Sequence, residues 1–188
     1  LMNRFREEDL YRRLNDADIV SLNPLRMNAV NEGGGEATAL AINEVALLRQ
    51  VNQAAHIRVL VNGSVKVDTL VCDGVLVATA AGSSAYNLSV QGPILPLGTD
   101  AIAMTPISPF RPRRWRGALL PKTAHVRFDV VDPDKRPVMA DADSRPVRNV
   151  QWVEVRSDEN IRHRILFDPG HGLGRDAGAG EGLHHQLR

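Results

Sequence analysis

The sequence predicts a mainly β fold, with antiparallel strands arranged in two layers around one core. Two observations support this prediction. Short apolar segments rich in β-branched residues follow one another through most of the 188 residues. Turn residues separate these segments, whereas the helices that a parallel sheet needs as crossovers are almost absent. Aromatic residues are only 4% of the chain, so the core must consist mainly of Val, Leu, Ile and Ala.

The N-terminal part predicts one short helix over residues 4–16. Acidic residues lie near its start and arginines near its end, which suits the helix dipole. Phe5, Leu10 and Leu14 have the spacing of one helix face.

Extended segments follow over residues 19–30 and 37–48, and three glycines at 33–35 end any regular element between them. The clearest local prediction is a β-hairpin over residues 57–68 with Asn62-Gly63 at its tip. Asn-Gly readily takes the positive φ that both central positions of a type I′ turn require, and apolar residues alternate on either side of it.

The rest of the chain predicts further strands, one short helix and a tail. The helix covers residues 84–90. The strands cover residues 69–77, 101–105, 125–131, 138–140, 150–156 and 162–167. The residues after Gly170 are rich in glycine and contain few apolar side chains, so they cannot form a core of their own. We therefore expect a flexible tail over 169–188. We expect its His184-His185 pair to be incidental rather than a metal site.

Charge and cysteine content exclude several functions. Lys and Arg number 23 and Asp and Glu 22, and the resulting net charge of +1 cannot supply the positive field that nucleic-acid backbones attract. A single cysteine, Cys72, excludes an internal disulfide and favours a reducing compartment and a buried, inert thiol. No apolar run approaches the roughly 20 residues that span a bilayer, and the first residues lack the apolar core of a signal peptide. We therefore expect a cytoplasmic protein with neither nucleic acid nor membrane as partner.

The most informative segment lies between Asp73 and Pro93. An apolar strand is followed there by glycines, several serines and Tyr86. A plain core strand would return through a short turn, whereas this stretch offers backbone amides around Gly82 and a series of hydroxyls. Glycine lets a polar ligand approach the backbone closely, so the segment predicts a nucleotide site.

Asn43 and Glu44 interrupt an otherwise apolar segment. Neighbouring side chains on a strand face opposite sides, so at least one should point inward, where an amide or carboxylate needs a hydrogen-bond partner. A ribose offers vicinal hydroxyls that a carboxylate accepts well. A strand end with solvated side chains explains the pair equally well from these residues alone.

Five short motifs occur in order along the chain: Ala41-Ile-Asn-Glu44, Asp73-Gly74, Gly82-Ser-Ser-Ala-Tyr-Asn-Leu-Ser89, Gly92-Pro93 and Pro106-Ile-Ser-Pro109. In this order and spacing they resemble the C-terminal part of the NAD kinases, and the resemblance extends over about residues 1–171. It implies a β-rich domain of the NAD kinase type. Residues 1–18 would then be the remnant of a preceding α/β domain, and residues 19–168 the NAD-binding domain.

The resemblance implies a phosphotransferase. The family transfers the γ-phosphoryl group of ATP, or of polyphosphate in some members, to the 2′-hydroxyl of the adenosine ribose of NAD, which gives NADP. It also implies Mg²⁺ or another divalent metal, an active site in the cleft between the two domains, and assembly as a homo-oligomer, either a dimer or a tetramer.

The same resemblance assigns the NAD-binding residues. Asn43 and Glu44 would hold nucleoside hydroxyls, and Tyr86 would place an apolar face beside a ring. The full set is Asn43, Glu44, His56, Asp73, Ser84, Ala85, Tyr86, Asn87, Leu88, Ser89 and Ser108. Residues 141–143 lie near a further position that contacts ligand in the family, but the match there is not typical and no role is assigned.

One family motif is missing. Gly-Gly-Asp-Gly, whose aspartate activates the ribose hydroxyl, occurs nowhere in the 188 residues, and Gly33-Gly34-Gly35-Glu36 is no substitute for it. No catalytic residue is therefore assigned, because the aspartate is expected to precede Leu1, and we expect the chain alone to be inactive. A non-catalytic dinucleotide-binding or oligomerisation module is the alternative.

Four arginines and Trp115 lie within residues 111–116. Arginine pairs with phosphate and tryptophan stacks on bases, which is compatible with a phosphate or nucleic-acid contact. The prolines and the loop position favour a solvated loop or an oligomer contact instead.

Overall fold

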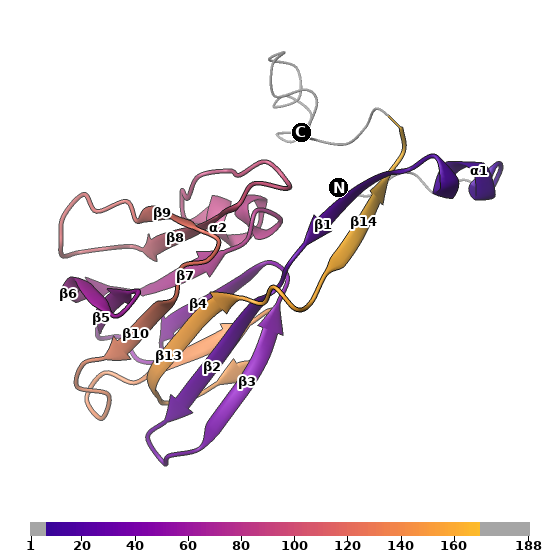
Figure 1. The fold of residues 1–188 in the computed structure, drawn as a ribbon. Coiled ribbons are helices and arrows are strands. Elements are labelled where there is room, and N and C mark those ends of the chain that lie inside the picture. Colours follow the sequence, from indigo (N-terminus) through magenta and orange to yellow (C-terminus); the bar gives the residue numbers. More distant parts are fainter. Residues whose placement is uncertain (1–6, 170–188) are drawn as a thin grey trace.

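The strands of this protein form two six-stranded sheets and one two-stranded ribbon. The structure is a computed structural model that describes residues 7–169. Every strand pairing within that range is antiparallel, and the two large sheets lie as separate layers (Figure 1). The predicted mainly β, two-layer fold is confirmed.

Each large sheet mixes strands from distant parts of the chain. The first sheet consists of β2 (Leu25–Asn31), β3 (Glu36–Ala41), β5 (Ala55–Val61), β6 (Ser64–Cys72), β10 (Val126–Val130) and β13 (Val150–Ser157), in the order β3-β2-β13-β10-β5-β6. The second consists of β4 (Glu44–Arg49), β7 (Gly74–Ala78), β8 (Ala101–Ile107), β9 (Ala118–Pro121), β11 (Val138–Ala142) and β12 (Pro146–Val147), in the order β12-β11-β4-β7-β8-β9.

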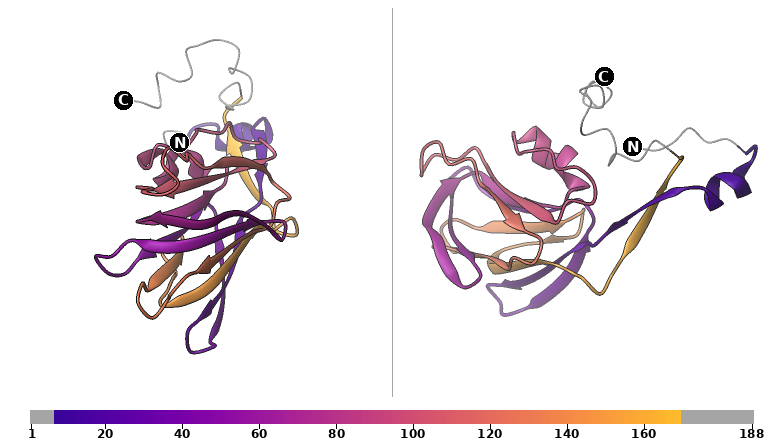
Figure 2. Two further views of the ribbon diagram at one scale, coloured as in Figure 1. Left: turned by 90° about the vertical axis from the view of Figure 1, so that its left-hand side faces the viewer. Right: turned by 45° about the horizontal axis from the view of Figure 1, so that its top comes forward.

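The two-stranded ribbon consists of β1 (Asp18–Leu22) and β14 (His163–Phe167), and it projects away from the sheets (Figures 1 and 2). Helix α1 (Leu10–Asn15) lies at its outer end. Nε and Nη2 of Arg13 each donate to a carboxylate oxygen of Asp168 at 2.9 Å. This bidentate pair fixes α1 to the end of β14.

Helix α1 is shorter than the prediction over residues 4–16. Residues 1–6 lie outside the described range. Residues 7–9 precede the helix, and Asp9 takes a left-handed conformation with φ 56°. The acidic residues therefore do not form a helical turn, and that part of the prediction is wrong.

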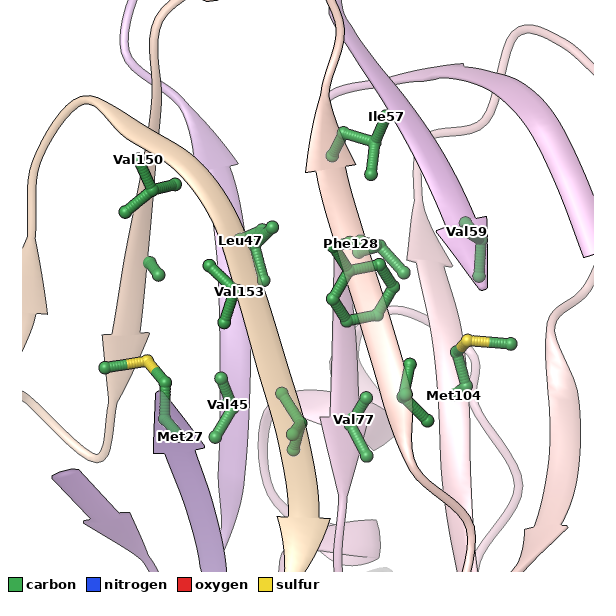
Figure 3. Packing of buried hydrophobic residues seen from close by; sticks show 14 of the residues in the cluster. Met27, Val45, Leu47, Ile57, Val59, Val77, Met104, Phe128, Val150 and Val153 are labelled. Atoms are coloured by element: carbon green, nitrogen blue, oxygen red, sulfur yellow. The ribbon is translucent and has the colours of Figure 1, made fainter. Parts of the chain in front are cut away.

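One hydrophobic core lies between the two sheets and draws on both of them (Figure 3). Buried and half-buried side chains alternate along β5, as expected for a strand with one face on the core. The fully buried side chains labelled in Figure 3 include Met27, Val45, Leu47, Phe128 and Val153. Aliphatic residues dominate the cluster, in agreement with the low aromatic content.

Strand β7 is buried on both faces. Val75 and Val77 belong to the main core, whereas Leu76 belongs to a separate apolar cluster. Tyr86, from the short helix α2 (Tyr86–Ser89), packs against that second cluster. The outer face of the second sheet is therefore covered by the segment that the sequence marks as a nucleotide site.

The chain crosses from one sheet to the other inside two predicted strands. The segment expected over 37–48 breaks at Ile42 and Asn43, between β3 and β4. The segment expected over 69–77 breaks at Asp73, between β6 and β7. A strand cannot keep its ladder while it moves to another sheet, so the prediction of continuous strands is wrong here. In the same way, the segment over 19–30 divides into β1 and β2.

The predicted hairpin is confirmed. β5 and β6 pair on either side of Asn62-Gly63, whose φ angles of 50° and 75° are those of a type I′ turn. β9 and β12 were not predicted, and both are edge strands. The predicted helix over 84–90 is present as a 3₁₀ turn (Gly82–Ser84) followed by α2.

Three further expectations concern single residues and the ends of the chain. Cys72 is 1% exposed, and burial raises the pKa of its thiol to about 12, which confirms a buried cysteine. Within residues 7–169, no helix has the length and apolar character to cross a membrane. The flexible tail and the histidine pair expected there lie, from residue 170 onward, outside the described residues.

Candidate functional site

The crossover between β3 and β4 is held on both sides by long-range hydrogen bonds. The backbone N–H groups of Ile42, Asn43 and Glu44 donate to the carboxylate of Asp143 at 2.5, 3.0 and 3.2 Å. On the carbonyl side, the N–H of Thr79 donates to Asn43 at 2.9 Å, and the Thr79 hydroxyl donates to Ile42 at 2.6 Å. The backbone of the Asn43-Glu44 pair is thus fixed from both sides.

The loop after β7 lies directly against this crossover. The hydroxyl of Thr79 accepts the N–H of Gly82 at 3.0 Å, which folds the loop back toward Asn43. A Cβ at Gly82 would lie 2.0 Å from the carbonyl oxygen of Asn43. Glycine is therefore required at this position because the two backbones touch.

The inner side of the loop consists of buried polar groups that are already hydrogen-bonded. The Ser83 hydroxyl donates to the carbonyl of Ala80 at 2.7 Å and accepts the N–H of Leu95 at 2.9 Å. The amide nitrogen of Asn87 donates to the carbonyl of Pro93 at 2.8 Å, and its oxygen accepts the Thr105 hydroxyl at 2.6 Å. These side chains hold the shape of the loop and face away from solvent.

An open pocket of about 360 Å³ lies where the crossover, the loop and β11 meet. Its lining residues are Asn43, Glu44, Ala46, Leu48, Tyr86, Asp141, Asp143 and Ser144. β4 supplies the apolar floor, Tyr86 supplies an aromatic wall, and the opposite wall is acidic. A volume of this order is enough for one nucleoside half of a dinucleotide.

The electrostatic potential in the pocket is negative, because its ionisable side chains are acidic. Burial raises the pKa of Glu44 above its ordinary value, and the charges of Asp143 and Asp141 raise it further against a backbone hydrogen bond from Tyr86. Burial and the charges of Glu44 and Asp73 raise the pKa of the Tyr86 phenol. Within the described residues, Glu44 Oε2 and Asp141 Oδ1 are buried atoms without a hydrogen-bond partner. The pocket therefore offers acceptors to a ligand that carries hydroxyl or amino donors.

The structure brings three of the predicted site residues together in this pocket: Asn43, Glu44 and Tyr86. Ser84 and Ala85 are half-buried in the loop just before Tyr86. Asp73 lies at the crossover between β6 and β7, where its carboxylate accepts Arg49 Nε at 2.6 Å.

The remaining predicted residues lie elsewhere. Asn87 is fully buried. Leu88 is exposed, and Ser89 and Ser108 line a second pocket of about 480 Å³ that also contains Arg114 and Arg116 of the basic run.

His56 lies on β5 in the first sheet. Burial and the positive charge of Arg136 lower the pKa of its imidazole. Nothing in the described residues places it at the pocket of Glu44, and its assignment stays a prediction.

Sequence reasoning assigned no role to Asp141 and Asp143, although both line the pocket. The available signal was Asp141 within an otherwise apolar strand and Asp143 directly after its end. The hydrogen bonds of Asp143 with residues 42–44 link positions about a hundred residues apart, which local pattern does not reveal.

The family follows from a match over most of the described chain. Residues 42–159, which include both crossovers and the loop, match the ATP-NAD kinase C-terminal domain. The chain belongs to the NAD kinase family. The matched part contains every pocket residue and all of the predicted site residues.

Curated relatives agree with this. The NAD kinase of Cereibacter sphaeroides (strain ATCC 17025) is 62% identical over 173 residues, which is 92% of this chain and 68% of that protein. The NAD kinases of Hyphomonas neptunium and Rhizobium meliloti are each 52% identical, and the alignments cover 68% and 66% of those proteins.

Solved NAD kinase structures share the fold. Yeast NADH kinase in complex with NADH has a TM-score of 0.71 at 24% identity, with 80% of this chain and 44% of that chain covered. An Archaeoglobus fulgidus NAD kinase in complex with ATP also has a TM-score of 0.71, at 20% identity, with 91% and 61% covered. This chain therefore spans less than two thirds of either structure.

Proposed function

We propose that this chain is the dinucleotide-binding part of an NAD kinase, an enzyme that phosphorylates the 2′-hydroxyl of the adenosine ribose of NAD to give NADP. ATP, or polyphosphate, would be the phosphoryl donor. The observation that carries the proposal is the pocket in which Asn43, Glu44 and Tyr86 meet, inside the part of the chain that matches the family.

The chemistry of the pocket suits one nucleoside of NAD. The carboxylate of Glu44 would accept both hydroxyls of a ribose, and its partnerless oxygen would gain a donor. The ring of Tyr86 would lie against the base or the ribose. Asp141 and Asp143 would repel phosphate, so the diphosphate of NAD would lie outside this pocket.

Catalysis depends on groups that the pocket does not supply. Phosphoryl transfer is mostly positioning and charge neutralisation, together with a group that orients or deprotonates the attacking hydroxyl. The Gly-Gly-Asp-Gly aspartate is not among the 188 residues, so we infer that the chain alone binds NAD but turns it over little. The second candidate is a non-catalytic dinucleotide-binding or oligomerisation module.

The family resemblance implies Mg²⁺ or another divalent metal, and the described residues do not fit one. No group of three or more His, Cys, Asp or Glu side chains among residues 7–169 is arranged to hold a metal ion. The carboxylate of Asp143 is already shared among three backbone N–H groups. We assign no metal step to these residues.

Assembly and location complete the proposal. Leu10, Tyr11 and Leu14 of α1 are 44%, 82% and 52% exposed, which is unusual for one short helix. We propose that helix α1 packs against the α/β part of the enzyme, and that the enzyme is a cytoplasmic homo-oligomer.

NAD titration of the purified 188-residue chain, followed by calorimetry, tests the proposal. We expect binding by the parent chain, retained binding by Tyr86→Phe, and at least about tenfold weaker binding by Tyr86→Ala and Glu44→Gln. A coupled assay with ATP and Mg²⁺ should detect no NADP. Absence of NAD binding would overturn the proposal, and steady NADP formation would refute the inactivity.

A further inference from the structure

Asp143 is in direct contact with the NAD-binding crossover although it lies far away in the sequence. It follows the last residue of β11, which pairs with β4 so that Ala142 is opposite Val45. Asp143 and Ser144 have positive φ angles of 45° and 74°, which turn the chain toward β12. This turn places the Asp143 carboxylate over the backbone of residues 42–44.

The crossover needs such a partner. The chain leaves β3 at Ala41 and enters β4 at Glu44, so the intervening N–H groups have no ladder to join. Asp143 Oδ2 accepts the N–H groups of Ile42 and Asn43, and Oδ1 accepts that of Glu44. One carboxylate therefore supplies all three acceptors, through charge-assisted hydrogen bonds.

The carbonyl side of the crossover is fixed independently by Thr79 and by the close contact with Gly82. Because its N–H groups and its carbonyl groups are both hydrogen-bonded, the backbone of Asn43 and Glu44 is held in one conformation. The side chains of the pair then leave the backbone in fixed directions, and Glu44 reaches the pocket wall beside Tyr86.

We propose that Asp143 is a positioning residue for NAD binding: its carboxylate holds the backbone at residues 42–44 so that Asn43 and Glu44 face the ligand. The proposal rests on the proposed function, because it takes Asn43 and Glu44 as the residues that contact NAD. Asp143 itself acts through the backbone, not through the reacting atoms.

The first test is amide hydrogen exchange of the 188-residue chain, with and without the substitutions Asp143→Asn and Asp143→Ala. Asn keeps the shape but replaces one acceptor oxygen by a donor that faces an N–H group. We expect the amides of residues 42–44 to exchange about tenfold faster or more in both variants, because a charged hydrogen bond is lost at each. Unchanged exchange there would overturn the proposal.

The second test is NAD affinity in the same variants. We expect the Kd for NAD to rise about tenfold in Asp143→Ala and somewhat less in Asp143→Asn. Asp134→Asn, at an exposed position between β10 and β11, should leave both exchange and Kd unchanged. Faster exchange with an unchanged Kd would show that Asp143 is only structural and would overturn the positioning role.

A third variant separates positioning from general stability. Val153→Ala removes two methyl groups from the core between the sheets and should lower the melting temperature without changing the Kd for NAD. If it weakened NAD binding as much as Asp143→Ala at equal loss of stability, the positioning role would be refuted. If the parent chain bound no NAD at all, the proposed function would fail, while the exchange experiment would still report on the crossover.

Discussion

The hydroxyl of Thr105 donates to the side-chain oxygen of Asn87 at 2.6 Å, inside the molecule and beneath the loop that follows β7. Both side chains are buried, at 2% and 0% exposure. The amide nitrogen of the same asparagine holds the carbonyls of Ser83 and Pro93. Thr105 of β8 therefore supports the loop after β7 through the side chain of Asn87.

Thr105→Val should lower the free energy of unfolding by about 1–3 kcal/mol, because it leaves a buried amide oxygen without a donor. Thr38→Val is the matched control, since Thr38 makes a similar hydrogen bond to Asn28 at an exposed position. Its effect should stay below about 1 kcal/mol. Denaturant titration measures both, and equal effects would contradict the supporting role of the buried pair.

Gly82→Ala should be harmful in a different way. The added methyl group would lie 2.0 Å from a backbone oxygen that cannot move without disturbing Thr79 and the crossover. We expect a loss of about 1–3 kcal/mol or more, together with weaker NAD binding. Gly33→Ala, whose Cβ would meet its nearest neighbour at an ordinary 3.4 Å, should change neither quantity.

Glu44→Gln should stabilise the chain at neutral pH and weaken NAD binding. The pKa of Glu44 is raised in the folded state, so the folded chain holds this proton more tightly than the unfolded chain. The corresponding stability is present below the ordinary glutamate pKa and is lost as pH rises through the raised value. Glutamine carries no charge, so the variant does not lose this stability as the pH rises.

The pH dependence gives the measurement. Melting curves at several pH values should show Glu44→Gln above the parent chain at pH 7, by less than about 1 kcal/mol because the side chain is only half-buried. The two curves should converge below the ordinary glutamate pKa. A parent chain that is the more stable at pH 7 would show that Glu44 is not strained by its surroundings.

Cys72 should react with a thiol reagent only when the protein unfolds. Its thiol is buried and its pKa is raised to about 12, so almost no thiolate exists at pH 8. Ellman's reagent should give no colour in buffer and one thiol per chain in denaturant. Rapid labelling of the native chain would contradict the burial.

Local chemistry made some elements predictable. The Asn62-Gly63 hairpin depends on two adjacent residues that accept positive φ, so its turn is predicted correctly, whereas its second strand continues to Cys72, beyond the predicted end at residue 68. The edge strands β9 and β12 were missed because their side chains are only half-buried or exposed and show little apolar alternation. The helix near residue 10 was placed correctly, but its start was not, because Asp9 leaves the helical conformation.

The site was predictable only in part. Asn43, Glu44 and Tyr86 were found because polar or aromatic residues stand out against apolar or glycine-rich surroundings. Which residues contact them, Asp143 above all, depends on the order of the strands in the second sheet. That order places β11 beside β4, and nothing in the local sequence of either strand specifies it.

The two crossovers have a mechanical consequence. Asn43 and Asp73 mark two of the places where the chain passes between the layers, and Asn43 also borders the pocket. Shear of one sheet over the other would therefore deform the pocket at its rim. The pocket lies on the outer face of the second sheet, so a bound ligand would hold Asn43 against that sheet and oppose movement of the crossover.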